Sequence, residues 1–267
     1  SASSHRRVTR AVRATTTTIR CVSDEGSSSR QQGSIQLDRR ALFTGAAALA
    51  ALEPLALEPA PARAAFDGSD SKMVGAYLPA GPDGLYVFEA RAPRTPALRA
   101  GALEPYSILL PPEFKEAPVS NARSGNYCQP RCDEATTEVQ FVEPSAGSLQ
   151  IIIIPTTKLL IAKQDPSVED VGTIDGILNA ISPAITGSVA AEPEEVVASS
   201  TKVKDGRSYY EYELLTPFAE FGLHSVSAVS TNKNYVMIAT IAASEKQWAK
   251  SEADLKKVID SFRVCVK

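Results

Sequence analysis

The segment that decides the fold is VVASSTKVKDGRSYYEYELL, residues 196–215. Two β-favouring runs, Val196–Val203 and Ser208–Leu215, flank Lys204-Asp205-Gly206-Arg207. An Asp-Gly pair favours a type I′ turn, because both central residues of that turn need positive φ. The sequence therefore predicts an antiparallel hairpin at this point.

Alternation along the second strand of this hairpin assigns its side chains to two faces. Tyr210 and Tyr212 fall on one face, and Tyr209, Glu211 and Glu213 fall on the other. Similar strand signals occur elsewhere, at Tyr106–Leu110, Glu138–Val142, Leu149–Ile154, Leu223–Val229 and Tyr235–Ala242. Leu149–Ile154 is apolar at nearly every position, which is the pattern of a strand buried on both faces.

Two helices are expected among these strands. Ser244 and Gln247 match a capping box, in which each side chain satisfies a backbone N–H of the first turn. The apolar stripe of the C-terminal helix comprises Trp248, Leu255, Val258, Ile259 and Phe262. Apolar residues at helical spacing predict an earlier helix over 168–185, which Pro183 ends or breaks. Several strands with few helices predict the α+β class, a mainly antiparallel sheet covered by helices.

The N-terminal part of the chain differs from the rest in composition. Residues 1–64 hold 9 Arg, no Lys and 5 acidic residues, whereas the whole chain has a net charge of −3. An Arg-rich, Ser/Thr-rich and acid-poor start is typical of a transit peptide, which we assign to residues 1–36. The acidic remainder argues against nucleic acid as the main partner.

A second targeting signal is expected over residues 37–64. Arg39 and Arg40 precede the apolar run 41–52, which is too short to span a bilayer, and Ala62 and Ala64 fit an A-x-A cleavage site. A transit peptide followed by a twin-arginine signal predicts delivery to the chloroplast thylakoid lumen. We expect residues 65–101 to form a loosely packed Pro/Gly/Ala-rich arm with one short strand at 85–89, and 102–267 to form the folded domain.

Several of these motifs, taken in order, resemble the PsbP family. The hairpin Asp205–Glu213, the helix start Ser244–Trp248 and the strand with its proline turn Tyr106–Phe114 carry the likeness. The resemblance implies an α-β-α sandwich around an antiparallel sheet, with the C-terminal helix packed on it. It also implies a non-enzymatic extrinsic protein of the thylakoid lumen, peripheral to the membrane. The expected partner is photosystem II or another thylakoid complex, whether the chain is a stable subunit or an assembly factor.

The segment Asn126–Cys132 is similar to a PsbP subgroup that carries paired cysteines. Cys128 and Cys132 can close a short disulfide if their Cβ atoms approach about 3.8 Å. Three interpretations remain open: a structural loop staple, a redox-regulated bond, and catalytic thiol exchange. The Cys-x₃-Cys spacing differs from the Cys-x-x-Cys of thioredoxin-type catalysis. The redox-regulated bond is the alternative to the first functional hypothesis.

No catalytic constellation is recognised in the sequence. His224 is expected to be a structural histidine, and no Gly-x-Ser-x-Gly elbow surrounds the nearby serines. A zinc site would need four ligands, and the sequence does not group them. Family resemblance allows Ca²⁺, but Glu192, Glu194 and Glu195 lack the pattern of a calcium loop and are expected to be solvated. No cofactor is required by the sequence.

Overall fold

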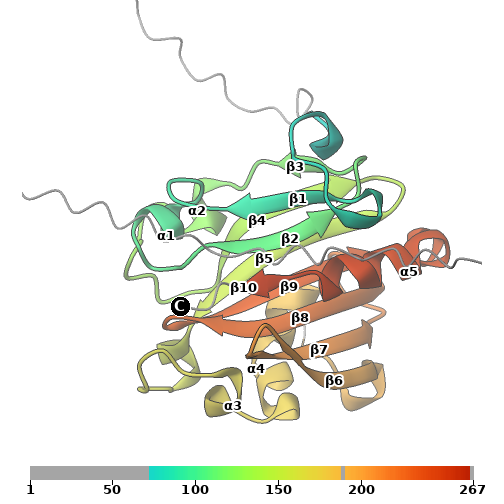
Figure 1. Ribbon diagram of the computed structural model, residues 1–267. Coiled ribbons are helices and arrows are strands. Elements are labelled where there is room, and N and C mark those ends of the chain that lie inside the picture. Colours follow the sequence, from blue (N-terminus) through green and yellow to red (C-terminus); the bar gives the residue numbers. More distant parts are fainter. Residues whose placement is uncertain (1–71, 188–189, 265–267) are drawn as a thin grey trace, which may run out of the picture. The chain divides into compact units, whose positions relative to one another are not determined.

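A seven-stranded antiparallel sheet forms the centre of the computed structural model, which describes residues 72–187 and 190–264 (Figure 1). Its strand order is β3-β4-β5-β9-β8-β7-β6. The strands are β3 (Lys115–Ala117), β4 (Thr136–Glu143), β5 (Gly147–Pro155), β6 (Val196–Lys204), β7 (Arg207–Leu215), β8 (His224–Asn232) and β9 (Tyr235–Ala243). Helices lie on both faces of the sheet, so the expected α+β sandwich is confirmed.

The hairpin predicted from 196–215 is present as β6 and β7. Asp205 and Gly206 have φ values of 52° and 78°, as a type I′ turn requires. Tyr209 is buried in the core on one face of the sheet, and Tyr210 and Tyr212 are buried in the core on the other. The assignment of these tyrosines to opposite faces is therefore confirmed.

Strand β5 is buried on both sides, which explains its uninterrupted apolar sequence. Ile151 and Ile153 point into the first core, and Ile152 and Ile154 point into the second. Neighbouring β9 is buried at every position. These two strands separate the two hydrophobic cores of the domain.

The second core is closed by two helices where one was expected. Helix α3 (Val168–Val171) ends at Gly172, and α4 (Ile174–Thr186) starts after the N-cap Thr173, whose side chain accepts a hydrogen bond from the Gly176 N–H. The prediction that Pro183 ends or breaks the helix is wrong, because α4 continues beyond it to Thr186. Ile185, two residues after Pro183, is buried in the second core and stabilises this continuation.

The first core is closed by α5 (Glu245–Asp260) and by a small second sheet, β1-β2-β10. The strands expected near 85–89 and at 106–110 are confirmed, whereas their pairing in a separate sheet with β10 was not expected. This sheet comprises β1 (Tyr86–Ala90), β2 (Tyr106–Leu110) and β10 (Arg263–Val264). The capping box is present, since Gln247 Oε1 accepts the Ser244 N–H at 2.7 Å. Phe262 is buried, as expected, but it follows the helix instead of belonging to it.

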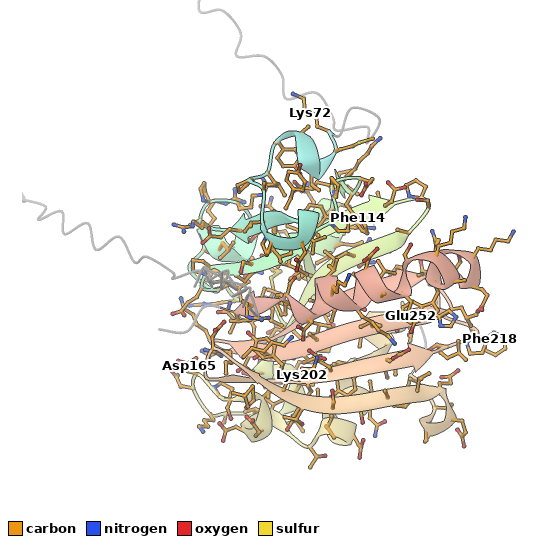
Figure 2. The ribbon with its side chains drawn as sticks, turned by 45° about the vertical axis from the view of Figure 1, so that its right-hand side comes forward. Lys72, Phe114, Asp165, Lys202, Phe218 and Glu252 are labelled. Atoms are coloured by element: carbon orange, nitrogen blue, oxygen red, sulfur yellow. A yellow bond between two sulfur atoms is a disulfide. The ribbon has the colours of Figure 1, made fainter. Side chains whose placement is uncertain are left out.

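Ion pairs fasten α5 to the strands beneath it. The Lys204 ammonium lies 2.7 Å from Glu211 Oε1 and donates to the Asp260 carbonyl at 2.8 Å. Lys202, which Figure 2 shows on the strands beside α5, bridges the same two acidic residues at 2.8 Å each. Only 6% of the Lys204 side chain is exposed, against 46% for Lys202, so Lys204 is the interior member of the cluster.

The expectation of a loosely packed arm is wrong for residues 72–101. They include η1 (Val74–Ala76), η2 (Pro82–Gly84), β1 and α1 (Pro96–Arg99). Val74, Phe88 and Leu98 are buried in the first core. The arm is rich in Pro and Gly because it makes tight turns against the core. The division of the chain at residue 101 stays a prediction.

The remaining short helices are α2 (Asn121–Ser124), η3 (Thr156–Leu159) and η4 (Pro193–Glu195). None of the helices within residues 72–187 and 190–264 combines the length and the apolar character needed to cross a membrane.

Candidate functional site: the disulfide loop and the buried carboxyl group near it

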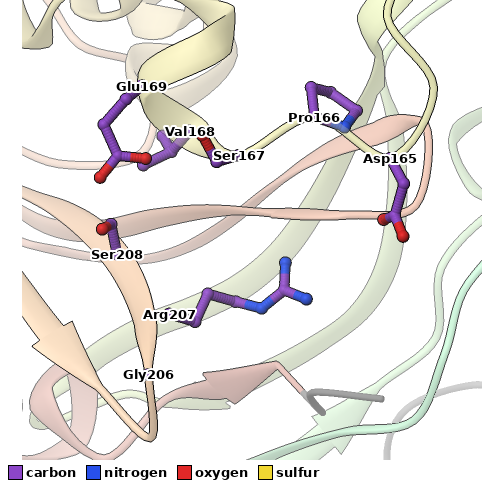
Figure 3. Close-up of a pocket in the computed structure, with 8 residues that line it drawn as sticks. All are labelled: Asp165, Pro166, Ser167, Val168, Glu169, Gly206, Arg207 and Ser208. Carbon is purple, nitrogen blue, oxygen red and sulfur yellow. The ribbon is translucent and has the colours of Figure 1, made fainter.

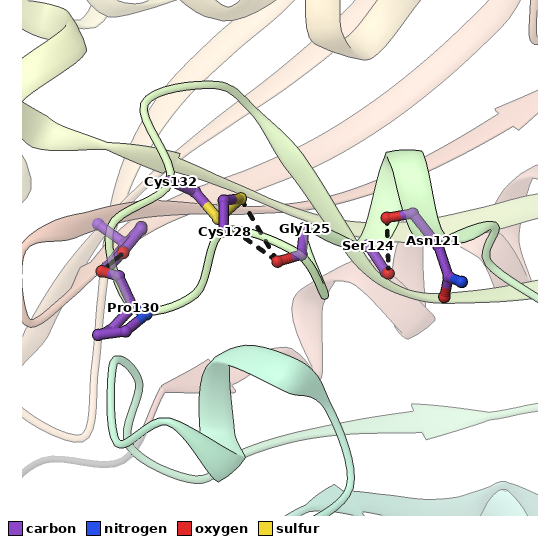
Figure 4. The surroundings of a disulfide bond; sticks show 7 residues. Asn121, Ser124, Gly125, Cys128, Pro130 and Cys132 are labelled. Carbon is purple, nitrogen blue, oxygen red and sulfur yellow. Dashed lines mark hydrogen bonds between the residues drawn. A yellow bond between two sulfur atoms is a disulfide. The ribbon is translucent and has the colours of Figure 1, made fainter.

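The loop between α2 and β4 carries the paired cysteines. Cys128 and Cys132 form a disulfide with their Cα atoms 4.9 Å apart, as Figure 4 shows. Both sulfur atoms lie against the carbonyl oxygen of Gly125, at 3.4 and 3.6 Å. The expected covalent link is therefore present in the structure, whereas its redox behaviour stays a prediction.

Gly125 holds this loop close to the start of β4. Its φ of +65° lies in the left-handed region that glycine favours. A Cβ atom at this position would lie 2.7 Å from Thr136 Cγ2 and 3.0 Å from Cys132 Sγ. The loop therefore sits directly on the first residues of β4, and a larger residue would force it away.

A tyrosine hydroxyl ties the loop to the sheet. Tyr235, at the start of β9, donates a hydrogen bond from Oη to the Pro130 carbonyl at 3.1 Å. Cys132 is only 4% exposed on the inner side of the loop. Tyr127 is 74% exposed on the outside. The loop thus has a buried inner surface and an aromatic side chain presented to solvent.

Glu138 of β4 lies near the loop, two residues after Thr136, at a position that the sequence presents only as part of an alternating strand. Thr137 pairs with Ile152 and Val139 pairs with Ile151, so Glu138 is the extra residue of a β-bulge. The bulge turns its side chain inward, where only 4% of the residue is exposed. Burial raises the pKa of this carboxyl group to about 7, and the Thr95 hydroxyl opposes the shift.

Two tyrosines share this interior with Glu138. Burial raises the pKa of Tyr106 well above its usual value, and the Glu138 carboxylate raises it further. Tyr235 responds in the same way, first to burial and then to Glu138 and Asp133. These three residues therefore form a polar group in which a negative charge is unfavourable at neutral pH.

A separate pocket lies at the far end of the β6–β7 hairpin, with a volume of about 260 Å³. It is lined by 165–169 and 206–208, and Figure 3 shows Asp165 and Arg207 pointing into the space between the two segments. The Ser208 hydroxyl is the main cause of the lowered pKa of Glu169. Arg207 Nη1 donates to the Thr231 carbonyl at 2.5 Å, which fastens the guanidinium to β8. A pocket of this kind suits a small polar molecule.

The other residues nominated from sequence have structural surroundings. His224 stacks on Trp248 with ring centroids 4.9 Å apart, and its Nε2 lies 2.8 Å from Glu245 Oε2. Glu195 accepts the Glu192 N–H at 2.9 Å and so caps η4. Within residues 72–187 and 190–264, no three His, Cys, Asp or Glu side chains are grouped as a metal site would require.

The targeting residues cannot be placed. Arg39, Arg40, Ala62 and Ala64 lie outside the described residues, as do the whole of 1–64 and Cys265. The transit and twin-arginine assignments therefore stay predictions.

Comparison with known proteins identifies the domain. The model of the PsbP family matches residues 104–264. Over 193 residues the chain is 36% identical to PsbP domain-containing protein 6, chloroplastic, of Arabidopsis thaliana, covering 72% of this chain and 73% of the relative. PsbP domain-containing protein 4, chloroplastic, of the same plant is 26% identical over 60% of this chain and 56% of its own length.

A solved structure gives a weaker match. The solution structure of cyanobacterial PsbP (CyanoP) from Synechocystis aligns with a TM-score of 0.41 and 16% identity, covering 67% of this chain and 92% of that one. The family-model match and the 36% identity decide the assignment. The chain belongs to the PsbP family.

Proposed function

We propose that this protein is a non-enzymatic extrinsic protein of the thylakoid lumen that binds photosystem II or another thylakoid complex on its lumenal side. The PsbP domain over 104–264 is the observation that carries the proposal. The chloroplastic names of its relatives and the transit-like composition of residues 1–36 support the compartment. Its role is in photosynthesis, as a subunit or as an assembly factor.

The contact surface is proposed to be the end of the sheet that carries the disulfide loop. Tyr127 is 74% exposed on that loop, and Leu160, just after η3, is 92% exposed. An ion pair between Lys158 of η3 and Glu134 links the two segments. Large apolar side chains exposed to solvent at one end of a domain are a common feature of protein interfaces.

Chloroplast import of the full-length chain tests the compartment and the partner together. After import, thylakoids are treated with protease from outside, then ruptured, and the lumenal fraction is separated on native gels. Protease protection with comigration in a photosystem-sized complex is the expected result. A stromal protein, or a lumenal pool that never comigrates with a complex, contradicts the proposal.

Matched variants test the surface. Replacing Tyr127 and Leu160 together by Ser is expected to reduce comigration at least several-fold without changing the amount of protein. Phe218 is 82% exposed in the loop after β7, at the opposite end of the sheet (Figure 2), so Phe218→Ser is the control. Equal loss in both variants would show that the disulfide-loop end is not the specific contact.

A second candidate function is redox regulation through the Cys128–Cys132 disulfide, which the structure contains. Closing a ring of only five residues removes little entropy from the unfolded chain, so the bond contributes little to stability. Thiol labelling of the imported protein, with and without reductant, measures its state. Cysteines that label freely without reductant, or a Cys128→Ser variant with unchanged partner capture, would contradict this candidate.

Calcium binding is the remaining family-based proposal. It predicts a Ca²⁺-dependent rise in melting temperature that EGTA reverses and Mg²⁺ does not reproduce. An unchanged melting temperature at millimolar Ca²⁺ would contradict it.

A further inference from the structure

We propose that Glu138 makes the seating of the Cys128–Cys132 loop dependent on pH: the loop is closed while Glu138 carries a proton, and ionisation of Glu138 favours a lifted loop with an accessible disulfide. The proposal concerns the folded domain alone and does not depend on which complex the protein binds.

Geometry places two contacts of the loop next to this residue. Thr136, two residues before Glu138, packs against Gly125 at one side of the loop. Tyr235, whose pKa Glu138 raises, holds Pro130 at the other side through its hydroxyl. The contacts of both ends therefore converge on the strand residues next to the buried carboxyl group.

The surroundings offer the ionised carboxylate little compensation. From the packed elements, the titratable and charged groups that face this interior are Tyr106 of β2, Tyr235 of β9, Arg94 before α1, Glu116 of β3 and Asp133 of the loop end. Arg94 is already paired with Glu116. The Thr95 hydroxyl favours the charged form of Glu138. Water is then the natural partner of the charge, and both carboxyl oxygens of Glu138 are shielded from it in the closed structure.

Of the segments near Glu138, the loop is the one that can move most easily. The neighbours of Glu138 named above belong to β2, to β9 and to the N-cap of α1, which are fixed by strand pairing and by the first core. The loop is held by the Pro130 hydrogen bond, by packing at Gly125, by the hydrogen bond from Arg99 to Asn126 at 3.1 Å and, just beyond Cys132, by the ion pair between Glu134 and Lys158. Lifting it breaks these side-chain contacts, and the strands stay paired.

The rate at which a water-soluble phosphine reduces the disulfide reports this opening. Rates are measured for the unmodified chain and for Glu138→Gln from pH 4.5 to pH 8. The rate of the unmodified chain divided by that of Glu138→Gln cancels the pH dependence of the reagent. The ratio is expected to rise with pH and to level off above pH 7. The pKa of a free glutamate carboxyl group is 4.5 and that of buried Glu138 is about 7. The ratio of rates can therefore rise by about 100-fold at most between pH 4.5 and pH 8.

Glu113→Gln is the control, because Glu113 is an exposed glutamate between β2 and β3, outside the disulfide loop. It is expected to keep the pH profile of the unmodified chain. Tyr235→Phe removes the hydroxyl that holds Pro130, so it is expected to raise the rate at every pH while the midpoint stays in place.

A ratio that is flat from pH 4.5 to pH 8 overturns the proposal. If Glu138→Gln does not fold, hydrogen exchange on the unmodified chain decides the question. The amides of Cys128 and Arg131, which bond within the loop, are then expected to lose protection as pH rises, after correction for intrinsic rates. Amides of β5 and β9 serve as the internal reference, and equal pH profiles for loop and reference would overturn the proposal.

Discussion

Replacing Glu138 by Gln is expected to remove a pH dependence from the stability of the whole domain. Burial raises the pKa of this carboxyl group from 4.5 to about 7 in the folded state. A raised pKa means that the folded state binds the proton more tightly than the unfolded state. The associated stability is therefore fully present below pH 4.5 and is lost as pH rises through 7.

The size of this loss follows from the shift. Each pKa unit corresponds to about 1.4 kcal/mol, so the shift of Glu138 is worth about 3 kcal/mol at most. A loop that lifts on ionisation limits the loss to the cost of lifting it. We expect the free energy of unfolding of Glu138→Gln, relative to the unmodified chain, to rise by about 1–3 kcal/mol between pH 4.5 and pH 8.

Urea unfolding at pH 4.5, 6 and 8, followed by Trp248 fluorescence and by circular dichroism, measures the difference. The exposed Glu113→Gln variant should track the unmodified chain at all three pH values. The difference in free energy of unfolding between Glu138→Gln and the unmodified chain must change with pH if the pKa of Glu138 is raised by folding. A change of less than about 0.5 kcal/mol across the range would refute the reasoning.

Three further substitutions test other contacts by urea unfolding. Tyr209→Phe removes the buried hydroxyl that accepts the Val264 N–H at 2.8 Å and should cost about 1–3 kcal/mol; an unchanged midpoint would show that β10 does not need this bond. Lys204→Met leaves Glu211 and Asp260 without their buried cation and should lower the free energy of unfolding by about 2–3 kcal/mol. Lys202 is 46% exposed, so Lys202→Met should lower it by less than about 1 kcal/mol. Equal losses would contradict the assignment of Lys204 as the interior member of the cluster. Gly125→Ala should cost about 1–3 kcal/mol and speed phosphine reduction of the disulfide, because its Cβ would meet Thr136; normal stability would show that the loop adjusts freely.

The main sheet could be predicted from sequence because its signals are local. The Asp205-Gly206 turn fixes a hairpin by backbone conformation alone. The apolar run 149–154 predicts burial on both faces, and the Ser244–Gln247 capping box marks the start of α5. Each of these signals lies within a few residues of the structure that it specifies.

The small sheet and the packed arm could not be predicted in the same way. Strand β10 has two residues and pairs with Ser107 and Tyr106 of β2, far earlier in the sequence. A strand of that length has no alternation to recognise. Residues 72–101 are rich in turn formers, and only the tertiary contacts of Val74 and Leu98 show that the segment is part of the core.

The candidate site combines a feature that the sequence displays with one that it hides. The cysteine pair is visible as a motif, whereas Glu138 alternates with apolar residues like any half-exposed strand position. One additional residue in the pairing of β4 with β5 leaves Glu138 without a partner on β5, and its carboxyl group is buried. A one-residue change of register is not encoded by a local pattern, so the buried carboxyl group could be found only in the structure.

The position of this carboxyl group has an energetic consequence that connects it to the loop. At neutral pH a buried glutamate destabilises the fold, whereas Gln in the same place would avoid the cost of a buried charge. Costs of this kind are expected mainly where a structure serves a function, and here the cost falls on one loop instead of on the paired strands. The disulfide keeps that loop compact, so proton loss from Glu138 can displace it without unravelling it. A short covalent ring next to a titratable group therefore restricts the response to pH to the surface where Tyr127 meets solvent.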